Sequence, residues 1–207
     1  KYLKGEEPTE AEIKASVRPA RKVARCSPAT SERRAAQDGS NEAHSVPFPV
    51  VGLGASAGGL AAFPEFFRAM RTPCGMAFVV VSHLDPDHKS ALTEILSHTT
   101  PMPVNEVTDG DKLLPDRVYV IPPNINMVVE GARLRLVPRG ETRGPHMPID
   151  ILLRSLAIAR KNRAVGVILS GTATDGTLGL KAIKGEGGIT FAQDNTAKHD
   201  GMPRSAV

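Results

Sequence analysis

The sequence predicts an α/β fold: a doubly wound, mostly parallel, Rossmann-like sheet with helices on both faces, plus a small β-hairpin. Two observations predict it. Several continuous apolar runs have the length and the Val, Ile and Leu content of strands that are buried on both faces. Amphipathic helical patterns separate these runs, as in parallel strands joined by crossover helices. With 207 residues, 41% of them hydrophobic, the chain is long enough for one domain of this class.

The first half of the predicted domain alternates strand and helix twice. Each strand is an apolar, β-branched run, and the first one breaks into a glycine-rich turn before its helix. The second helix carries Leu92, Ile95 and Leu96 on one face. We therefore expect strands at 47–54 and 76–83, and helices at 59–71 and 89–99.

The second half adds a hairpin and further strand and helix pairs. Gly131 lies between two short apolar runs, which is typical of a hairpin with glycine in its turn. One helical pattern begins with proline in its first turn and has i, i+3, i+4, i+7 spacing at Ile149, Leu152, Leu153 and Leu156. We expect strands at 117–122, 165–170 and 189–193, a hairpin from 126–129 and 134–138, and helices at 148–162 and 177–184.

The chain divides near Val46 into two parts of different composition. Residues 1–46 are rich in charged and small residues without sustained periodicity, which predicts a disordered tail or linker with a transient helix over 10–17. Residues 47–207 form the predicted domain. Its core is expected to be aliphatic, because the chain has no Trp and only 4% aromatic residues.

Charge and cysteine content exclude several classes of function. The net charge of +4 is spread along the chain rather than gathered with aromatic residues, which argues against nucleic-acid binding. Cys26 and Cys74 form no disulfide framework, so we expect reduced thiols and a cytoplasmic location. No apolar run approaches the length of a membrane span, and the charged N-terminus has no signal-peptide pattern.

Polar residues follow three of the predicted strands, where parallel sheets place their functional sites. Ser56 lies at the apex of a glycine-rich turn, beside backbone N–H groups of the next helix. His83 ends the second strand, and Asp175 follows the run at 165–170. Together they supply the residue types of a nucleophile, a general base and a carboxylate that orients the base.

Each of these residues also has a simpler interpretation. Ser56 is a possible helix N-cap, and its turn also suits a phosphate. His83 is a possible strand-end histidine bonded to backbone, and Asp175 a cap of the helix beginning near Gly176. A metal site from His83, Asp85, Asp87 and His88 is disfavoured, because proline interrupts their spacing and no further ligand cluster exists.

Several motifs together resemble the CheB-type chemotaxis methylesterases, the protein-glutamate methylesterases. The resemblance covers residues 48–207. Its branch resembles fusions of CheB and CheR, in which this domain opens a larger protein with methyltransferase and sensory modules. The motifs occur in the family's order: GASAGG at 54–59, SHL at 82–84, YVIPPN at 119–124, HMP at 146–148, VGVILSGTATDG at 165–176 and GMPRSAV at 201–207.

The resemblance implies a role for each candidate residue. Ser56 matches the nucleophile, His83 the base and Asp175 the carboxylate, and the implied reaction is hydrolysis of glutamyl methyl esters with release of methanol. Some members also deamidate glutamine. The oxyanion would bind backbone N–H groups of Ala57, Gly58, Thr172 and Ala173. No cofactor or metal is implied. The implied partner is a methylated chemoreceptor or another glutamyl-methylated signalling protein, with a methyltransferase and a sensory kinase fused or associated.

The sequence departs from the family pattern at several places. Ala57 replaces the usual Thr, and Ser-Gly-Thr-Ala at 170–173 replaces Thr-Gly-Met-Gly, which changes the expected oxyanion loop. The 46 residues before the catalytic region are too few for the family's receiver domain, so we expect phosphorelay control to come from elsewhere. The chain stops at Val207, where a closing helix should begin, and we expect a fragment.

Three alternatives stay open. The first is a catalytically weak, methylesterase-like regulatory or binding module. The second is an α/β-hydrolase-type esterase, because residues 54–58 read G-x-S-x-G and His199 could then replace His83. The third is a dinucleotide-binding module, since Gly52, Gly54 and Ala57 match the loose fingerprint, although no acidic residue ends the second strand.

Overall fold

A computed structural model describes residues 48–83, 91–139 and 146–207. The tail or linker expected over 1–46 lies outside the described residues. The contacts of the chain separate residues 1–44 from a compact unit at 45–207, and the fold below is that of the second unit.

Six strands form the main sheet, and every neighbouring pair in it is parallel. Their order is β3-β4-β2-β1-β7-β8. The strands are β1 (Val50–Ala55), β2 (Ala77–Ser82), β3 (Val104–Glu106), β4 (Arg117–Val120), β7 (Ala164–Ile168) and β8 (Ile189–Ala192). From β1 the chain builds outward through β2, and later returns to add β7 and β8 on the other side. The strand order therefore reverses at the boundary of β1 and β7, where α/β sheets place their ligand sites at the carboxyl edge.

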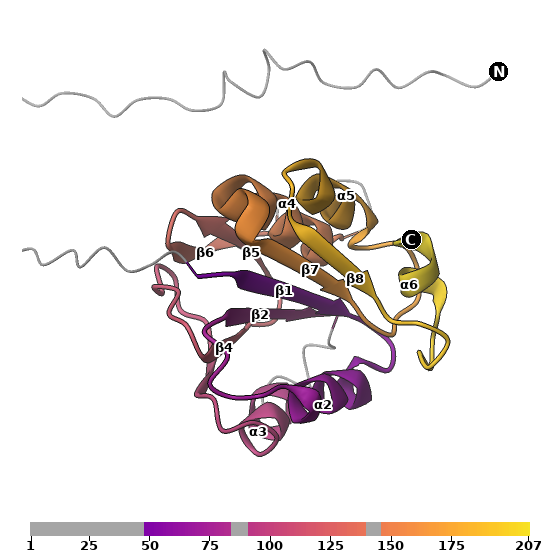
Figure 1. The fold of residues 1–207 in the computed structure, drawn as a ribbon, viewed down its shortest axis with the longest axis horizontal. Coiled ribbons are helices and arrows are strands. Elements are labelled where there is room, and N and C mark those ends of the chain that lie inside the picture. Colours follow the sequence, from indigo (N-terminus) through magenta and orange to yellow (C-terminus); the bar gives the residue numbers. More distant parts are fainter. Residues whose placement is uncertain (1–47, 84–90, 140–145) are drawn as a thin grey trace, which may run out of the picture. The chain divides into compact units, whose positions relative to one another are not determined.

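Helices cover both faces of this sheet (Figure 1). One face carries α4 (Pro148–Arg160), α5 (Thr177–Gly185) and a hairpin of β5 (Ile125–Glu130) and β6 (Arg133–Pro138). The other face carries α2 (Gly59–Ala69) and α3 (Ala91–Ser97), and the short α6 (Gly201–Ser205) follows β8. The doubly wound parallel architecture and the small hairpin predicted from the sequence are confirmed.

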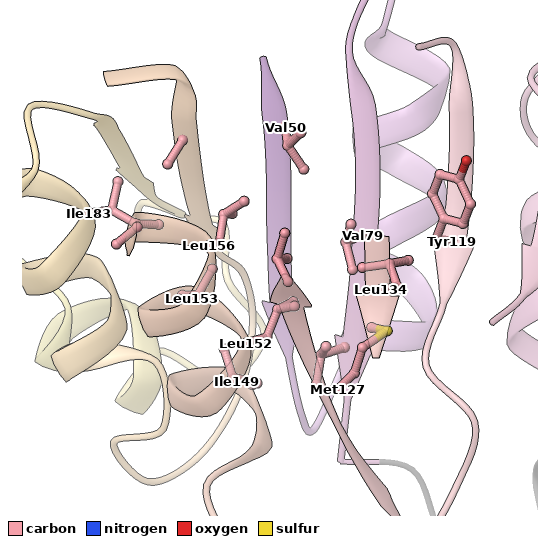
Figure 2. Close-up of a cluster of buried hydrophobic side chains, with 14 of the residues drawn as sticks. Val50, Val79, Tyr119, Met127, Leu134, Ile149, Leu152, Leu153, Leu156 and Ile183 are labelled. Atoms are coloured by element: carbon pink, nitrogen blue, oxygen red, sulfur yellow. The ribbon is translucent and has the colours of Figure 1, made fainter. Parts of the chain in front are cut away.

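Each face has its own core. On the α4 face, the four residues predicted from helical spacing are fully buried against the sheet and the hairpin (Figure 2): Ile149, Leu152, Leu153 and Leu156. The buried residues of this part of the core are aliphatic apart from Met127, Met202 and Tyr119, as expected. The α2 face differs, because Phe67 and Phe78 pack edge to face with ring centroids 5.4 Å apart and Phe66 joins them. The expectation of an aliphatic core is therefore wrong for this face.

The predicted element boundaries differ from the observed ones by a few residues, with one element missed. The edge strand β3 was not expected, because it has only three residues and two of them are exposed. Such a strand is defined by its pairing with β4 rather than by an apolar pattern of its own. A 3₁₀ turn at Lys161–Arg163 also ends α4 slightly earlier than expected.

Candidate active site

Ser56 lies one residue beyond the end of β1, in a turn too tight for most side chains. Gly58 has a φ of 86°, and a Cβ there would lie 2.5 Å from the Ser170 hydroxyl. Gly59 N–H donates to Ser56 O at 2.9 Å and closes the turn. Gly58, not Ser56, is the N-cap of α2, and that helix has no side-chain cap. The N-cap interpretation of Ser56 is therefore wrong, and the partly buried Ser56 hydroxyl has no partner among the described residues.

His83 follows β2 directly and lies beside this turn. In the β1–β2 register Ala55 pairs with Ser82, and His83 N–H donates to Ala55 O at 3.3 Å. Ser56 and His83 thus occupy neighbouring positions at the same edge of the sheet. The His83 side chain is 32% exposed, and its Nε2 lies 2.6 Å from Asp175 Oδ2. The interpretation of His83 as a histidine that binds only backbone is therefore wrong.

Asp175 is almost fully buried, at 1% exposure, and its carboxylate has three donors. Besides His83, the N–H groups of Ile149 and Asp150 donate to it at 3.0 and 2.8 Å. Both belong to the first turn of α4, whose N-terminal dipole also favours a negative charge. Asp175 therefore serves the start of α4, and it does not cap α5, whose N-cap Gly176 has no side-chain hydrogen bond.

These contacts determine which imidazole nitrogen is available for proton transfer. An ionised carboxylate only accepts hydrogen bonds, so His83 Nε2–H is the donor to Asp175. Neutral His83 then carries its lone pair on Nδ1. The arrangement supplies a base, His83, that a buried carboxylate orients and that follows the strand next to that of Ser56.

The loop before Asp175 contains a strained residue. Ala173 has a φ of 68°, in the left-handed region that favours glycine. Thr172, Ala173 and Thr174 are all exposed. Among the described residues, the N–H groups of Ala57, Gly58, Thr172 and Ala173 donate to no backbone acceptor outside regular elements. They are thus available to bind an anionic oxygen.

A second layer of contacts ties the Ser56 turn to the segment before α6, and sequence reasoning missed it. Buried Ser170 donates its hydroxyl proton to Ala57 O at 2.9 Å and accepts from His199 N–H at 3.0 Å. Gly171 N–H donates to His199 O, and Met202 N–H donates to Gly171 O, both at 2.9 Å. A hydroxyl directly after a buried strand was the available signal, because it ends the same run that leads to Asp175.

A second histidine, noted in the sequence only as part of the motif at 146–148, also lies near the site. The rings of His146 and His83 have centroids 6.4 Å apart, and His146 Nε2 lies 2.8 Å from Asn126 Oδ1. Burial lowers the pKa of His146, and the charges of Arg139 and His83 lower it further, against the opposing charge of Asp175. His146 is thus a neutral neighbour of His83 that the hairpin holds through β5.

The structure also tests the alternative assignments. Asp175 binds His83 rather than His199, so the α/β-hydrolase assignment of His199 as base is not supported; His199 instead lies against Gly58. Asp85, Asp87 and His88 of the metal hypothesis lie outside the described residues. Within the described ranges, no three His, Cys, Asp or Glu side chains are grouped to hold a metal ion. Cys26 also lies outside them, and Cys74 is a free thiol.

Cavity size does not identify the site. An apolar cavity of about 580 Å³ lies between α2 and strands β7 and β8, and none of the three candidate residues lines it. The assignment depends instead on hydrogen-bond geometry at the sheet edge. No helix in the described part of the chain has both the length and the apolar character needed to cross a membrane.

Comparisons with known proteins identify the family and the fold. A family model described as CheB methylesterase matches residues 51–207. The crystal structure of the Thermotoga maritima CheB methylesterase catalytic domain superposes with a TM-score of 0.70 at 27% sequence identity, covering 78% of this chain and 88% of that one.

Curated relatives carry related names. A protein-glutamate methylesterase/protein-glutamine glutaminase of Myxococcus xanthus is 35% identical over 160 residues, which are 76% of this chain and 44% of that protein. A putative enzyme of the same name from Leptospira interrogans is 31% identical over 77% of this chain and 84% of its own length. An uncharacterized 104.1 kDa protein of Rhodobacter capsulatus is 44% identical over 117 residues, only 12% of its length. The chain thus spans less than half of the first and last of these relatives.

Proposed function

Because this chain belongs to the CheB methylesterase family, we propose that its domain hydrolyses glutamyl methyl esters on chemotaxis receptors, releasing methanol and restoring glutamate. The observation that carries the proposal is the 2.6 Å contact between His83 Nε2 and the buried carboxylate of Asp175, at the strand end next to Ser56. A base that is oriented in this way can accept the serine proton and so makes the hydroxyl an effective nucleophile.

In the first half of the reaction, the Ser56 oxygen attacks the ester carbonyl while His83 Nδ1 accepts the hydroxyl proton. The carbonyl π electrons move onto the oxygen and form a tetrahedral oxyanion. When that intermediate collapses, the bond to the methoxy group breaks, and His83 returns its proton to the leaving oxygen. Methanol departs, and an acyl-enzyme remains on Ser56.

In the second half, water replaces methanol. His83 takes a proton from the water as its oxygen attacks the acyl carbonyl, and then protonates Ser56 as the ester bond to the enzyme breaks. The products are the glutamate side chain and the free enzyme, so atoms and protons balance without a cofactor.

Two further groups stabilise charge during these steps. Asp175 holds the imidazole with its lone pair on Nδ1 and stabilises the imidazolium when it forms. Backbone N–H groups of Ala57 and Gly58, and of Thr172 and Ala173 across the turn, stabilise the oxyanion. Their availability among the described residues supports this assignment.

The test is methanol release from a methylated receptor, with Ser56→Ala as the control. We expect Ser56→Ala and His83→Ala each to lower turnover by roughly 10³-fold or more, and the double variant to lose little beyond that, because the groups act as one unit. Circular dichroism should show that all three variants fold. Effects that multiply in the double variant would contradict a shared catalytic unit.

A second activity is glutamine deamidation, because several relatives bear the name protein-glutamine glutaminase. The same triad would form the same acyl-enzyme from an amide, with ammonia as the leaving group. Ammonia release from a receptor whose methylation sites are glutamine tests it.

A catalytically weak regulatory module is the alternative that the strained Ala173 loop favours. A serine-directed fluorophosphonate probe distinguishes an active hydrolase from such a module, because only an activated Ser56 is labelled.

The organisation around the domain belongs to the same proposal. We place the catalytic domain at 47–207 and assign 1–46 to a tail or linker. The partner would be a methylated chemoreceptor or another glutamyl-methylated protein in the cytoplasm, with a methyltransferase and sensory kinase fused or associated. Co-purification of the native full-length protein from its own cells would identify these modules.

A further inference from the structure

Helices α4 and α5 begin side by side, and neither supplies a side-chain cap for its own first turn. The N-cap of α4 is Met147 and that of α5 is Gly176, and neither makes a side-chain cap hydrogen bond. Each helix therefore begins with backbone N–H groups that need acceptors from elsewhere.

The two helices meet this need by exchanging aspartates. Asp175, directly before α5, accepts from Ile149 N–H and Asp150 N–H at the start of α4. In return, Asp150 on α4 accepts from Gly179 N–H in the first turn of α5, at 2.7 Å. The start of each helix is thus held by a carboxylate that belongs to the other.

Asp150 is a buried carboxylate with no part in the chemistry proposed above. It is 5% exposed. Burial raises its pKa, and the nearby charge of Asp175 adds to the rise, whereas N–H groups of Gly179 and Gly176 and the charge of Arg154 oppose it. A buried carboxylate beside a second carboxylate is unfavourable unless hydrogen-bond donors compensate for the burial. The hydrogen bonds that Asp150 accepts therefore indicate a structural role for it.

The close approach of the helices depends on Gly179. A Cβ at this position would lie 2.5 Å from Leu153 Cβ and 3.3 Å from Asp150 Oδ1. Only glycine therefore lets α5 approach α4 closely enough for its N–H to reach Asp150. The glycine at 179 and the close packing of α5 against α4 are both needed for the hydrogen bond from Gly179 N–H to Asp150.

We propose that Asp150 is a positioning residue of the catalytic triad: it holds the start of α5, and with it Asp175, where the Asp175 carboxylate meets His83 Nε2. Asp150 acts through Asp175 and touches neither Ser56 nor the substrate. In the loop at 171–176, Thr172, Ala173 and Thr174 are exposed, so the position of Asp175 depends on its contacts with α4 and on where α5 begins. The inference rests on the proposed function only for its kinetic readout.

The experiment compares Asp150→Ala and Asp150→Asn with the parent. Its first readout needs no substrate: the ¹H NMR signal of His83 Nε2–H, which lies far downfield when a short hydrogen bond to a carboxylate is intact, assigned by its loss in His83→Gln. In Asp150→Ala we expect this signal to move upfield or to broaden. In Asp150→Asn the change should be smaller, because the amide oxygen still accepts from Gly179.

The second readout is hydrolysis of the methyl ester. We expect kcat to fall roughly 10-fold or more in Asp150→Ala with little change in KM, because a small displacement of a catalytic group affects the chemical step and not substrate binding. The matched control is Asp116→Asn. That carboxylate also accepts two backbone N–H groups, from Cys74 and Gly75, but lies at the opposite edge of the sheet. It should leave the His83 signal and kcat unchanged.

Parental kcat and a parental His83 signal in folded Asp150→Ala would overturn the proposal, even if the variant is less stable. If Asp150→Ala does not fold, Asp150→Ser decides in the same way, because its shorter side chain cannot reach Gly179 N–H. A shifted signal supports the proposal, and parental values overturn it. A parent that hydrolyses no methyl ester would contradict the proposed function, whereas the NMR comparison would still decide the role of Asp150.

Discussion

Asp175 serves two structures at once. Its carboxylate binds His83 and also accepts the first two free N–H groups of α4. Because Asp175 both orients His83 and accepts hydrogen bonds from α4, we expect its substitution to affect stability as well as catalysis. Ala173, two residues earlier, adopts a strained conformation in the same loop. The residues of this loop therefore give the sharpest tests.

Asp175→Asn should lower both turnover and stability. Asparagine has one acceptor oxygen, so its NH₂ group would face His83 or the backbone N–H of Asp150 and leave a buried donor unpaired. We expect a cost of about 1–3 kcal/mol in urea unfolding, and a loss of at least ~10²-fold in methanol release, because the imidazole tautomer is no longer held. Parental stability would show that α4 does not need this acceptor.

Ala173→Gly should stabilise the domain. Alanine at a φ of 68° has a steric cost that glycine avoids, which exceeds the extra flexibility of glycine in the unfolded chain. We expect a gain of about 0.5–1 kcal/mol by urea unfolding. The matched control is Ala132→Gly in the exposed β5–β6 turn, where φ is ordinary and the change should be neutral or slightly destabilising. Equal effects at the two positions would argue against strain at Ala173.

His146 should make stability depend on pH in a defined window. Its pKa is lowered in the folded state, chiefly by burial, from an ordinary value of 6.5. The unfolded chain therefore binds more protons between the folded value and 6.5, and stability falls as pH falls through that window. His146→Gln cannot titrate but can still donate to Asn126. We expect its free energy of unfolding to change less than that of the parent between pH 7 and 5; equal slopes would contradict this.

At the scale of elements, the approach of α4 to the sheet controls the site. Gly52 and Gly54 of β1 lie under this helix: a Cβ at Gly52 would be 2.6 Å from Leu153 Cδ2, and one at Gly54 would overlap Ile149 Cγ2. Ile149 also donates its N–H to Asp175. The small residues of β1 therefore do more than form the turn at Ser56, because they determine how closely α4 can bring its donors to the triad.

Gly54→Ala should consequently impair stability and catalysis together. The added methyl group must displace Ile149, which we expect to cost about 1–3 kcal/mol in urea unfolding and to lower turnover of the folded protein. Gly185→Ala at the end of α5 is the control, because a Cβ there would meet nothing within 4 Å and the φ of Gly185 is ordinary. That variant should be as active as the parent and more stable by up to ~1 kcal/mol. An active, stable Gly54→Ala protein would show that α4 shifts without disturbing Asp175.

At the scale of the whole molecule, three segments distant in sequence meet at one sheet edge. His83 and Asp175 are 92 residues apart and are joined by a 2.6 Å contact. Among the described residues, the cores on both faces of the sheet support this edge.

Deleting residues 1–45 should leave the melting temperature and the basal rate of methyl ester hydrolysis close to those of the parent. A polar segment of this composition buries little apolar surface, so its removal costs little. Differential scanning calorimetry and methanol release measure the two quantities. A fall in melting temperature of more than a few degrees would mean that the segment packs against the domain.

Much of this could be predicted from local patterns, and the misses have physical reasons. The buried strands and the α4 face were visible because burial on both faces requires continuous apolar runs, and burial of one helix face requires 3.6-residue spacing. The strand β3 was missed because three residues carry no period. The contacts of Asp150 and His146 were missed because their partners, Gly179 and Asn126, are 29 and 20 residues away in sequence.

By itself, the sequence determined the fold class, the two-sided burial of the sheet and the polar residues at three strand ends. Each of these follows from composition and spacing within a short window. Only the tertiary structure decided that β2, β1 and β7 are neighbours, that Nε2 of His83 meets Asp175, and that α4 and α5 exchange aspartates. These features depend on how closely two helices pack on one face of the sheet, and that distance is set by glycines and side chains that are far apart in the chain.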